Sequence, residues 1–315
     1  DAVGNAVVDS ASGAPYPTYM TEPSRKPWSA DDIPDQSGRT VIITGANSGL
    51  GAETAKALAR HGAKVVLACR NTAKADDVAA AIGAAATVRE LDLADLNSVR
   101  AFADTVEGAD VLINNAGIMA VPLRRTAQGF ESQMGTNHLG HFALTALLLP
   151  KITDRVVTLS SGMHLLGRIN LGDLNWERRI YRRWQAYGDS KMANLMFGLE
   201  LAKRLSDAGS DKKSFIAHPG IASTSLTGHT ESIYGPLMKL TVLPIGQSSA
   251  DGALPTLLAA TTPDAPSGTF FGPKQLFGLR GAPVKSGYAP RAKDKAIREG
   301  LWRESERLTG IDFTV

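Results

Sequence analysis

Residues 44–51, Thr-Gly-Ala-Asn-Ser-Gly-Leu-Gly, constrain the fold of this chain more than any other stretch. An apolar run at 40–43 precedes them, and the following segment, 52–59, has the composition of a helix. Glycine lets a backbone turn tightly and approach a ligand closely. A helix that begins there directs unpaired N–H groups and the positive end of its dipole at an anion. The stretch therefore predicts a phosphate-binding turn between a strand and a helix, with an ordinary glycine turn as the alternative.

Short apolar runs alternate with helical patterns from residue 38 onward. The runs lie at 40–44, 64–69, 87–91, 111–114, 155–160 and 214–218, with a last candidate at 269–271. They are continuous, which is typical of strands buried on both faces of a parallel sheet. Apolar residues recur at helical spacing over 96–106 behind the candidate N-cap Asp95, and 136–149 and 187–204 are further helical candidates. The pattern predicts one α/β domain, a doubly wound parallel sheet of about seven strands flanked by helices.

Composition excludes several classes of protein. The net charge of +3 is too small to argue for a nucleic-acid partner or an anionic membrane surface. No apolar run approaches the length of about 18 residues that a membrane span needs, so none is expected. The single cysteine, Cys69, excludes an internal disulfide and a cysteine-built metal site. It is compatible with a reducing compartment, and we expect a cytoplasmic protein.

The first 37 residues differ from the rest. They contain five prolines and no sustained periodicity. They also lack the charged start and apolar core of a secretory signal. We therefore expect an N-terminal extension over 1–37 and a domain over 38–315. Met20 is a candidate start, which would make 1–19 an upstream or cloning-derived addition; an arm packed on the domain is the other interpretation.

Side chains at the ends of successive strands are the candidate ligand contacts, because ligands of open α/β sheets bind at the carboxyl ends of the strands. Arg70 ends the second run, where a dinucleotide's adenosine ribose is expected. No carboxylate stands there to bond both ribose hydroxyls, and an arginine can pair with a 2′-phosphate, which favours NADP(H) over NAD(H). A solvated arginine is the alternative. Asp92 and Leu93 follow the third run, at the adenine edge, and the Asn-Asn-Ala-Gly turn at 114–117 follows the fourth.

Tyr187 and Lys191 are the strongest candidates for chemistry. Residues four apart share one face of a helix, so both side chains can point into one site. A free phenol has a pKa near ~10, and a nearby cation lowers that pKa toward the working range. Ser160 and Ser161 end the fifth run and offer a hydroxyl to orient a carbonyl oxygen. An exposed helix pair is the alternative, which the position after that run disfavours.

With these motifs in order, the chain resembles the short-chain dehydrogenase/reductase family from about residue 38. The narrower resemblance is to the retinol dehydrogenase and protochlorophyllide reductase-like branch. It rests on the segments Leu67-Ala68-Cys69-Arg70, Ser190-Lys191-Met192-Ala193-Asn194 and His218-Pro219-Gly220, and on the gap of 26 positions between Ser161 and Tyr187. Gly188-Asp189, inside the tyrosine–lysine motif, departs from that branch.

The resemblance implies a single-domain Rossmann fold and four catalytic residues. Tyr187 would be the acid/base, and Lys191 would hold the nicotinamide ribose and tune Tyr187. Ser161, the second serine of the pair, would polarise the substrate oxygen, and Asn137 would hold a proton-relay water. The implied cofactor contacts are Gly45, Asn47, Ser48, Gly49, Leu50, Gly51, Arg70, Asp92, Leu93, Asn115, Ala116, Gly117, Tyr187, Lys191, Pro219, Gly220 and Thr224.

The expected function is an NADP(H)-dependent oxidoreductase that passes hydride between nicotinamide and a carbonyl or alcohol carbon. An apolar loop over 224–246 with hinge glycines favours an apolar small molecule as substrate. The alternatives are a C=C reductase of the same fold, and an NADP-sensing protein without catalysis. The intact set of four residues argues against the sensor.

The histidines, an arginine-rich segment and the last helix bear on possible metals, nucleic acids and subunits. His138, His141 and His164 have no carboxylate or cysteine set beside them, so we read them as helix and loop histidines and expect no metal. Four arginines interleaved with aromatics at 178–184 suit an anionic substrate tail or a nucleic acid, but a solvated amphipathic segment is favoured, and no nucleic-acid partner is expected. A last helix over 297–308, stopped by Gly310, is core or a subunit contact, which leaves a homodimer or homotetramer open.

Overall fold

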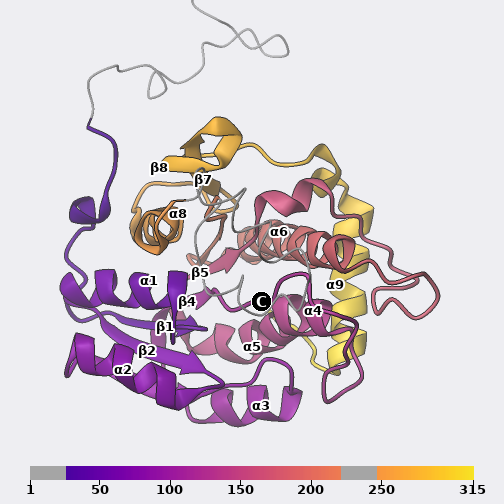
Figure 1. Ribbon diagram of the computed structural model, residues 1–315, viewed down its shortest axis with the longest axis horizontal. Coiled ribbons are helices and arrows are strands. Elements are labelled where there is room, and N and C mark those ends of the chain that lie inside the picture. Colours follow the sequence, from indigo (N-terminus) through magenta and orange to yellow (C-terminus); the bar gives the residue numbers. More distant parts are fainter. Residues whose placement is uncertain (1–25, 221–246) are drawn as a thin grey trace, which may run out of the picture.

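The computed structural model describes residues 26–220 and 247–315. These form a single α/β domain on a sheet of eight strands in the order β3-β2-β1-β4-β5-β6-β7-β8 (Figure 1). The strands are β1 (Thr40–Thr44), β2 (Lys64–Cys69), β3 (Ala86–Glu90), β4 (Ala109–Asn114), β5 (Ile152–Leu159), β6 (Lys213–Ala217), β7 (Phe270–Gln275) and β8 (Arg280–Lys285). The seven strands from β3 to β7 in this order all pair in parallel, which confirms the predicted doubly wound sheet.

The eighth strand was not predicted. β8 pairs antiparallel with β7 at the edge of the sheet. Its sequence contains Gly281 and Pro283, which are rare in central strands and confined mostly to edges and bulges. An edge strand of this composition has no continuous apolar run, so the pattern that located the buried strands does not apply to it.

Helices cover both faces of the sheet. They are α1 (Gly49–Arg60), α2 (Thr72–Ile82), α3 (Leu96–Asp104), α4 (Ser132–Met134), α5 (Gly140–Leu148), α6 (Arg183–Asp207), α8 (Ser249–Thr261) and α9 (Lys295–Thr309). In β1, Val41 and Ile43 pack with α1, α2 and α8, whereas Ile42 packs in the core with α3, α5, α6 and α9. Alternate residues of one strand thus enter different cores, which explains the continuous apolar runs.

Helix boundaries follow local signals closely. The Asp95 side chain accepts a hydrogen bond from Asn97 N at 2.9 Å and caps α3, and Gly310 ends α9 in the left-handed conformation. The helix expected over 136–149 instead begins with α4, continues through a π-helical turn, η3 (Gly135–Leu139), and then α5. α6 starts at Arg183, so Tyr187 lies one turn inside the helix.

Residues 26–37 lie against the domain. Ile33 is buried with the α1 face of the sheet, and Gln36 N donates to His61 O at 2.7 Å. Residues 1–25 lie outside the described residues. Across 26–220 and 247–315, no helix has both the length and the apolar character needed to cross a membrane.

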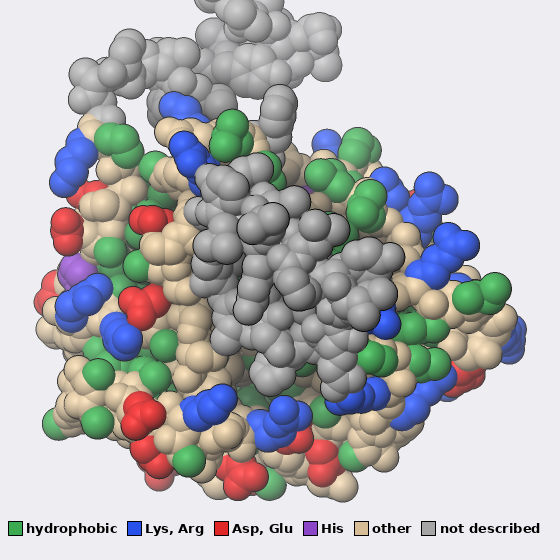
Figure 2. Space-filling view, in the orientation of Figure 1, with side chains coloured by type: hydrophobic (Ala, Val, Ile, Leu, Met, Phe, Trp, Pro, Cys, Tyr) green, Lys and Arg blue, Asp and Glu red, His purple; other side chains and the backbone are tan. Residues whose placement is uncertain are grey.

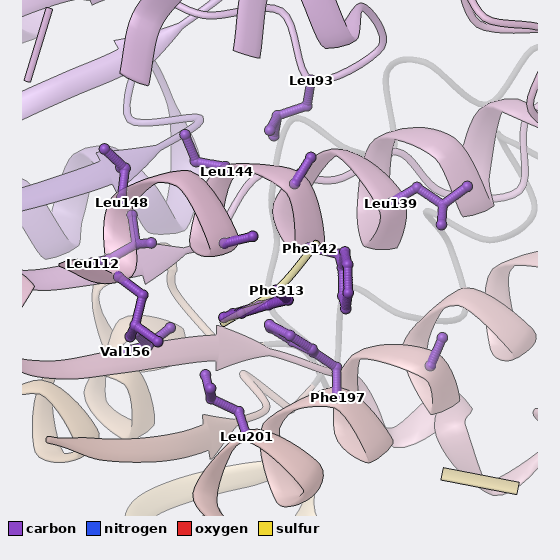
Figure 3. Close-up of a cluster of buried hydrophobic side chains, with 14 of the residues drawn as sticks. Leu93, Leu112, Leu139, Phe142, Leu144, Leu148, Val156, Phe197, Leu201 and Phe313 are labelled. Carbon is purple, nitrogen blue, oxygen red and sulfur yellow. The ribbon is translucent and has the colours of Figure 1, made fainter. Parts of the chain in front are cut away.

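An aromatic cluster joins α9 to the core. Three of its rings, those of Phe142, Phe197 and Phe313, lie together in Figure 3. The ring of Trp302 lies 4.5 Å from that of Phe313 and 5.2 Å from that of Phe142 in α5, measured between centroids. Phe197 of α6 stacks on the same indole at 5.7 Å. The last helix was expected to be part of the core or a subunit contact. Its buried face is part of the core.

We expect Trp302→Ala to reduce the free energy of unfolding by about 3–5 kcal/mol, because it leaves a cavity among these rings. Urea unfolding followed by circular dichroism measures the change. Arg303→Ala, one residue further along α9 and exposed, should stay within about 0.5 kcal/mol. A loss below about 1 kcal/mol for Trp302→Ala would contradict the central place of the cluster.

Candidate active site

The hydroxyl of Thr44 joins the ends of β1 and β4. Its Oγ1 accepts hydrogen bonds from the backbone N of Asn115 and of Ala116, both at 2.9 Å, and lies 2.8 Å from His141 Nε2. His141 Nδ1 lies 2.9 Å from Asn137 O, so Nδ1 donates there and Nε2 accepts the Thr44 proton. Burial lowers the pKa of His141 to about 3, which keeps the ring neutral in this arrangement.

The glycine stretch is shaped by close packing. Gly45 and Gly49 have φ of 65° and 54°, the left-handed region that favours glycine. A Cβ at Gly51 would lie 2.5 Å from Gly45 O and 2.6 Å from Asn115 Nδ2, so a side chain there would clash. Asn115 Nδ2 in turn donates to Thr44 O at 2.7 Å. The turn and the fourth strand end therefore fit together only with these glycines, and α1 begins directly at the turn.

A cleft of about 610 Å³ opens at these strand ends. This is within the range of small-molecule sites. Twelve predicted cofactor contacts line it: Gly45, Asn47, Ser48, Gly49, Leu50, Gly51, Arg70, Asp92, Leu93, Asn115, Ala116 and Gly117. The first-turn amides of α1, which have no carbonyl partner within the helix, and the basic side chains of Arg70 and Lys74 are donors suited to phosphates. The residues present thus fit a dinucleotide.

The remaining predicted cofactor contacts after β6 are placed differently. Pro219 and Gly220 are not among the residues that line the cleft. Pro219 O accepts from Gln247 Nε2 at 2.8 Å, and Gly220, with φ of 67°, packs against Leu279 O, where a Cβ would lie at 2.3 Å. Thr224, and the apolar loop that contains it, lie outside the described residues.

The predicted catalytic side chains, including the predicted cofactor contacts Tyr187 and Lys191, are not part of the cleft lining but lie next to it, behind Gly117. Tyr187 is buried, the Ser161 side chain is near enough to influence the pKa of its phenol, and Lys191 Nζ lies 5.8 Å from the centroid of the Tyr187 ring. A Cβ on Gly117, which lines the cleft, would lie 3.4 Å from Lys191 Nζ and 3.2 Å from Asn137 Oδ1. The four side chains therefore come together where the fourth strand end meets α6.

Asn137 holds this junction from the π-helical turn. Its Nδ2 donates to Ile118 O and to Ser190 Oγ, both at 2.9 Å, and its Oδ1 accepts from Ile118 N at 2.8 Å. The two serines that end β5 differ in role: Ser160 Oγ donates to Lys191 O at 2.8 Å and faces α6, whereas Ser161 is the one beside Tyr187.

Burial controls the charge states of the site. It raises the pKa of the Tyr187 phenol above its ordinary value, while the Ser161 side chain acts in the opposite direction. It also lowers the pKa of Lys191 to about 8. The direction for Tyr187 is opposite to the lowering expected from Lys191 alone, because the loss of solvation outweighs the neighbouring groups.

Three residues of the site were missed by the sequence analysis. Thr44 and His141 form the bond that joins β1, β4 and the helix after the π-helical turn, and Lys74 lines the cleft beside Arg70. The spacing of four between Asn137 and His141 was an available signal that the histidine ring could reach the carbonyl one turn back. No group of histidine, cysteine and acidic residues in the described parts of the chain could hold a metal ion.

Comparisons with known proteins agree with this geometry. The sequence model of the short chain dehydrogenase family matches residues 39–233. Retinol dehydrogenase 12 of Mus musculus is 38% identical over 314 residues, covering 94% of this chain and 95% of that protein. Retinol dehydrogenase 13 of Homo sapiens is 41% identical over 296 residues, covering 87% and 86%. A crystal structure of an uncharacterized protein from Mycobacterium Paratuberculosis has a TM-score of 0.81 and 51% identity, covering 92% of this chain and all of that one, 100%.

The chain belongs to the short-chain dehydrogenase/reductase family, a class of oxidoreductases that use a nicotinamide cofactor, NAD or NADP. Within that family it belongs to the retinol dehydrogenase branch, whose members act on an alcohol or carbonyl group. Both levels of the resemblance drawn from the motifs are confirmed.

The depressed pKa of Lys191 gives a stability prediction. Because the folded pKa of about 8 lies below the ordinary 10.5, the unfolded chain binds more protons between these values, and stability rises with pH across that window. At pH 7 the buried charge therefore costs stability, and we expect Lys191→Met to stabilise the fold by about 1–3 kcal/mol.

Urea unfolding at pH 7 and at pH 10 measures this effect. The gain from Lys191→Met should shrink as the pH rises from about 8 toward 10.5, because the folded lysine loses its charge first, and the pH-dependent part of the gain ends above 10.5, where the lysine is neutral in both states. Lys203→Met, at an exposed position on the same helix, should show no such gain. A pH-independent gain would contradict the assignment of the effect to the buried charge.

Proposed function

We propose that this protein is an NADP(H)-dependent oxidoreductase that transfers hydride between nicotinamide and the carbonyl or alcohol carbon of an apolar substrate. The observation that carries the proposal is the convergence of Tyr187, Ser161 and Lys191 beside Gly117 at the edge of the cleft. A buried phenol beside a hydroxyl and close to a cation is suited to exchanging a proton with a substrate oxygen.

A nicotinamide cofactor, when bound, would supply or accept the hydride. In reduction, the Tyr187 hydroxyl donates its proton to the substrate oxygen, and the Ser161 hydroxyl orients the same oxygen. Below a pH of about 8 Lys191 is charged, and this charge favours the phenolate that Tyr187 becomes after donating. Asn137 keeps the turn after β4 in place through its bonds to Ile118. Burial of these side chains excludes water from the transfer.

The preference for NADP(H) is supported by unusual charges at the start of α2. Arg70 and Lys74 both line the cleft there, and the first turn of α2 has no acidic residue. Cations at the N-terminus of a helix are opposed by the helix dipole. This placement is therefore unfavourable by itself and becomes favourable when an anion such as a 2′-phosphate lies between them.

The substrate class is supported by the named relatives. Two of them, 38% and 41% identical to this chain, are retinol dehydrogenases. A retinol-like substrate is a long apolar molecule with a terminal alcohol or aldehyde, which suits a site that donates one proton to one oxygen. We therefore take all-trans-retinal as the first probe, within a panel of apolar aldehydes, ketones and quinones.

We expect Tyr187→Phe to lower NADPH-dependent turnover of the active probe by at least about 10²-fold, because the proton donor is lost. NADPH oxidation measures turnover, and NADPH binding, followed by fluorescence, should be retained. Equal turnover by the wild type and Tyr187→Phe would contradict the acid/base role of Tyr187. Chromatography of the product separates the proposed alcohol from the saturated product of a C=C reductase.

For the cofactor, we expect Arg70→Ala and Lys74→Ala each to weaken NADPH binding by about 10-fold or more, through loss of a charge-assisted bond to the 2′-phosphate. NADH binding should change little. Arg60→Ala, an exposed cation at the far end of α1, is the matched control. If the ratio of NADPH to NADH affinity is unchanged in both variants, the proposed selectivity is wrong.

A further inference from the structure

The segment between Ser161 and Tyr187 is fastened to the catalytic helix. It passes through the turn η5 (Gly162–Leu165) and then runs along the right side of the molecule before entering α6 (Figure 1). Basic side chains gather on that side of the surface (Figure 2). The fastening point is Gly188-Asp189, which lies between Tyr187 and Lys191 in the tyrosine–lysine motif.

Gly188 permits a close approach of backbones. A Cβ on Gly167 would lie 2.2 Å from Gly188 O, and a Cβ on Gly188 would lie 3.0 Å from Met163 O. The chain that leaves the catalytic serine therefore packs directly on the residue that follows Tyr187. Larger residues at either glycine would separate the two.

Asp189 completes the contact. Its carboxylate is 1% exposed. Oδ1 accepts from Arg168 N at 2.9 Å and from Gln185 Nε2 at 2.7 Å, and Oδ2 accepts from Arg179 Nη2 at 3.3 Å. Arg179 also bonds Asp173 Oδ2 at 3.2 Å. A carboxylate buried to this degree is costly unless it is paired and hydrogen-bonded.

A short path of hydrogen bonds leads from this carboxylate to Ser161. Arg168, bonded to Asp189, follows Gly167, whose N donates to His164 O at 3.0 Å. His164 N and Nδ1 both lie within bonding distance of Ser161 O, at 3.0 Å and 2.6 Å. Tyr187 lies on the same helix as Asp189, two residues before it. One side chain thus links the turn of the serine to the turn of the tyrosine.

We propose that Asp189, with Arg179 as its counter-ion, is a positioning residue that holds Ser161 in register with Tyr187. The role rests on the proposed function of that pair. The proposal also assigns a role to one arginine of the arginine-rich segment. Arg179 forms ion pairs with Asp173 and Asp189 and lies over the Trp176 ring, with Cζ 3.7 Å from the centroid.

The chain offers a matched control in Asp173. It is 8% exposed and pairs with the same Arg179, but it belongs to the segment and not to α6. Asp189→Asn and Asp173→Asn each keep the shape and the acceptor for backbone amides while removing one charge. A purely structural role predicts equal effects of the two variants. A positioning role predicts that only Asp189→Asn disturbs catalysis.

With NADPH and all-trans-retinal, or the active member of the panel, we expect Asp189→Asn to lower kcat by about 10-fold or more, because small displacements of reacting groups are costly. The KM for NADPH should stay unchanged. Asp173→Asn should keep kcat within about twofold. Arg179→Lys, which retains the charge, should keep more of the wild-type kcat than Arg179→Met. Equal kcat values for Asp189→Asn and Asp173→Asn would overturn the proposal.

Hydrogen exchange measured by mass spectrometry tests the same link without turnover. Amides of peptides covering 162–168 and 184–191 should exchange faster in Asp189→Asn than in Asp173→Asn. If the wild type turns over no probe, the proposed function fails while exchange still decides the link. Equal exchange of these peptides in the two variants would show that Asp189 does not hold the serine turn on the helix.

Discussion

The site depends on one hydroxyl, that of Thr44. It accepts hydrogen bonds from two backbone amides in the turn after β4 and donates one to a neutral histidine, His141, on α5. This fixes the distance between two strand ends, and the glycine turn and Asn115 then pack against each other with no room for a side chain at Gly51. The same histidine reaches back to the carbonyl of Asn137. The walls of the cleft and the proposed catalytic residues therefore share one support, and a change at either strand end reaches both.

Around that support, the site collects groups that are unfavourable in a protein interior. A phenol with a raised pKa, a lysine with a lowered one and a buried carboxylate lie within one turn of the same helix. The buried charges of the lysine and the carboxylate cost stability, whereas the phenol stays neutral, and the aromatic core under α9 and the two apolar layers offset that cost. A site built in this way keeps water out and leaves proton positions to a few hydrogen bonds. That property is what a proton transfer to a single substrate oxygen needs.

Much of the fold and the candidate site could be predicted because their signals are local. The strands buried on both faces, the glycine stretch and the tyrosine–lysine spacing each occupy a few consecutive residues. What was missed depends on pairs distant in sequence or on burial: Thr44 with His141, Asp189 with Arg179, and the edge pairing of β8. The direction of the Tyr187 pKa was misjudged because the sequence reveals the nearby lysine but not the depth at which the phenol is buried.

The π-helical turn η3 shows how finely the site depends on chain length. The Gly140 N–H donates a hydrogen bond to Gly135 O, five residues back instead of four. The turn therefore contains one extra residue compared with a regular α-helix. In an α-helix each residue adds a rotation of about 100° around the helix axis. The extra residue thus sets the angle between Asn137, which bonds Ser190 of α6, and the downstream face with His141 and Thr145, which bond Thr44 and Asn114. Deleting one residue of the turn would leave Asn137, His141 and Thr145 in the sequence but would rotate the first relative to the other two, so that both sets of contacts could not form together.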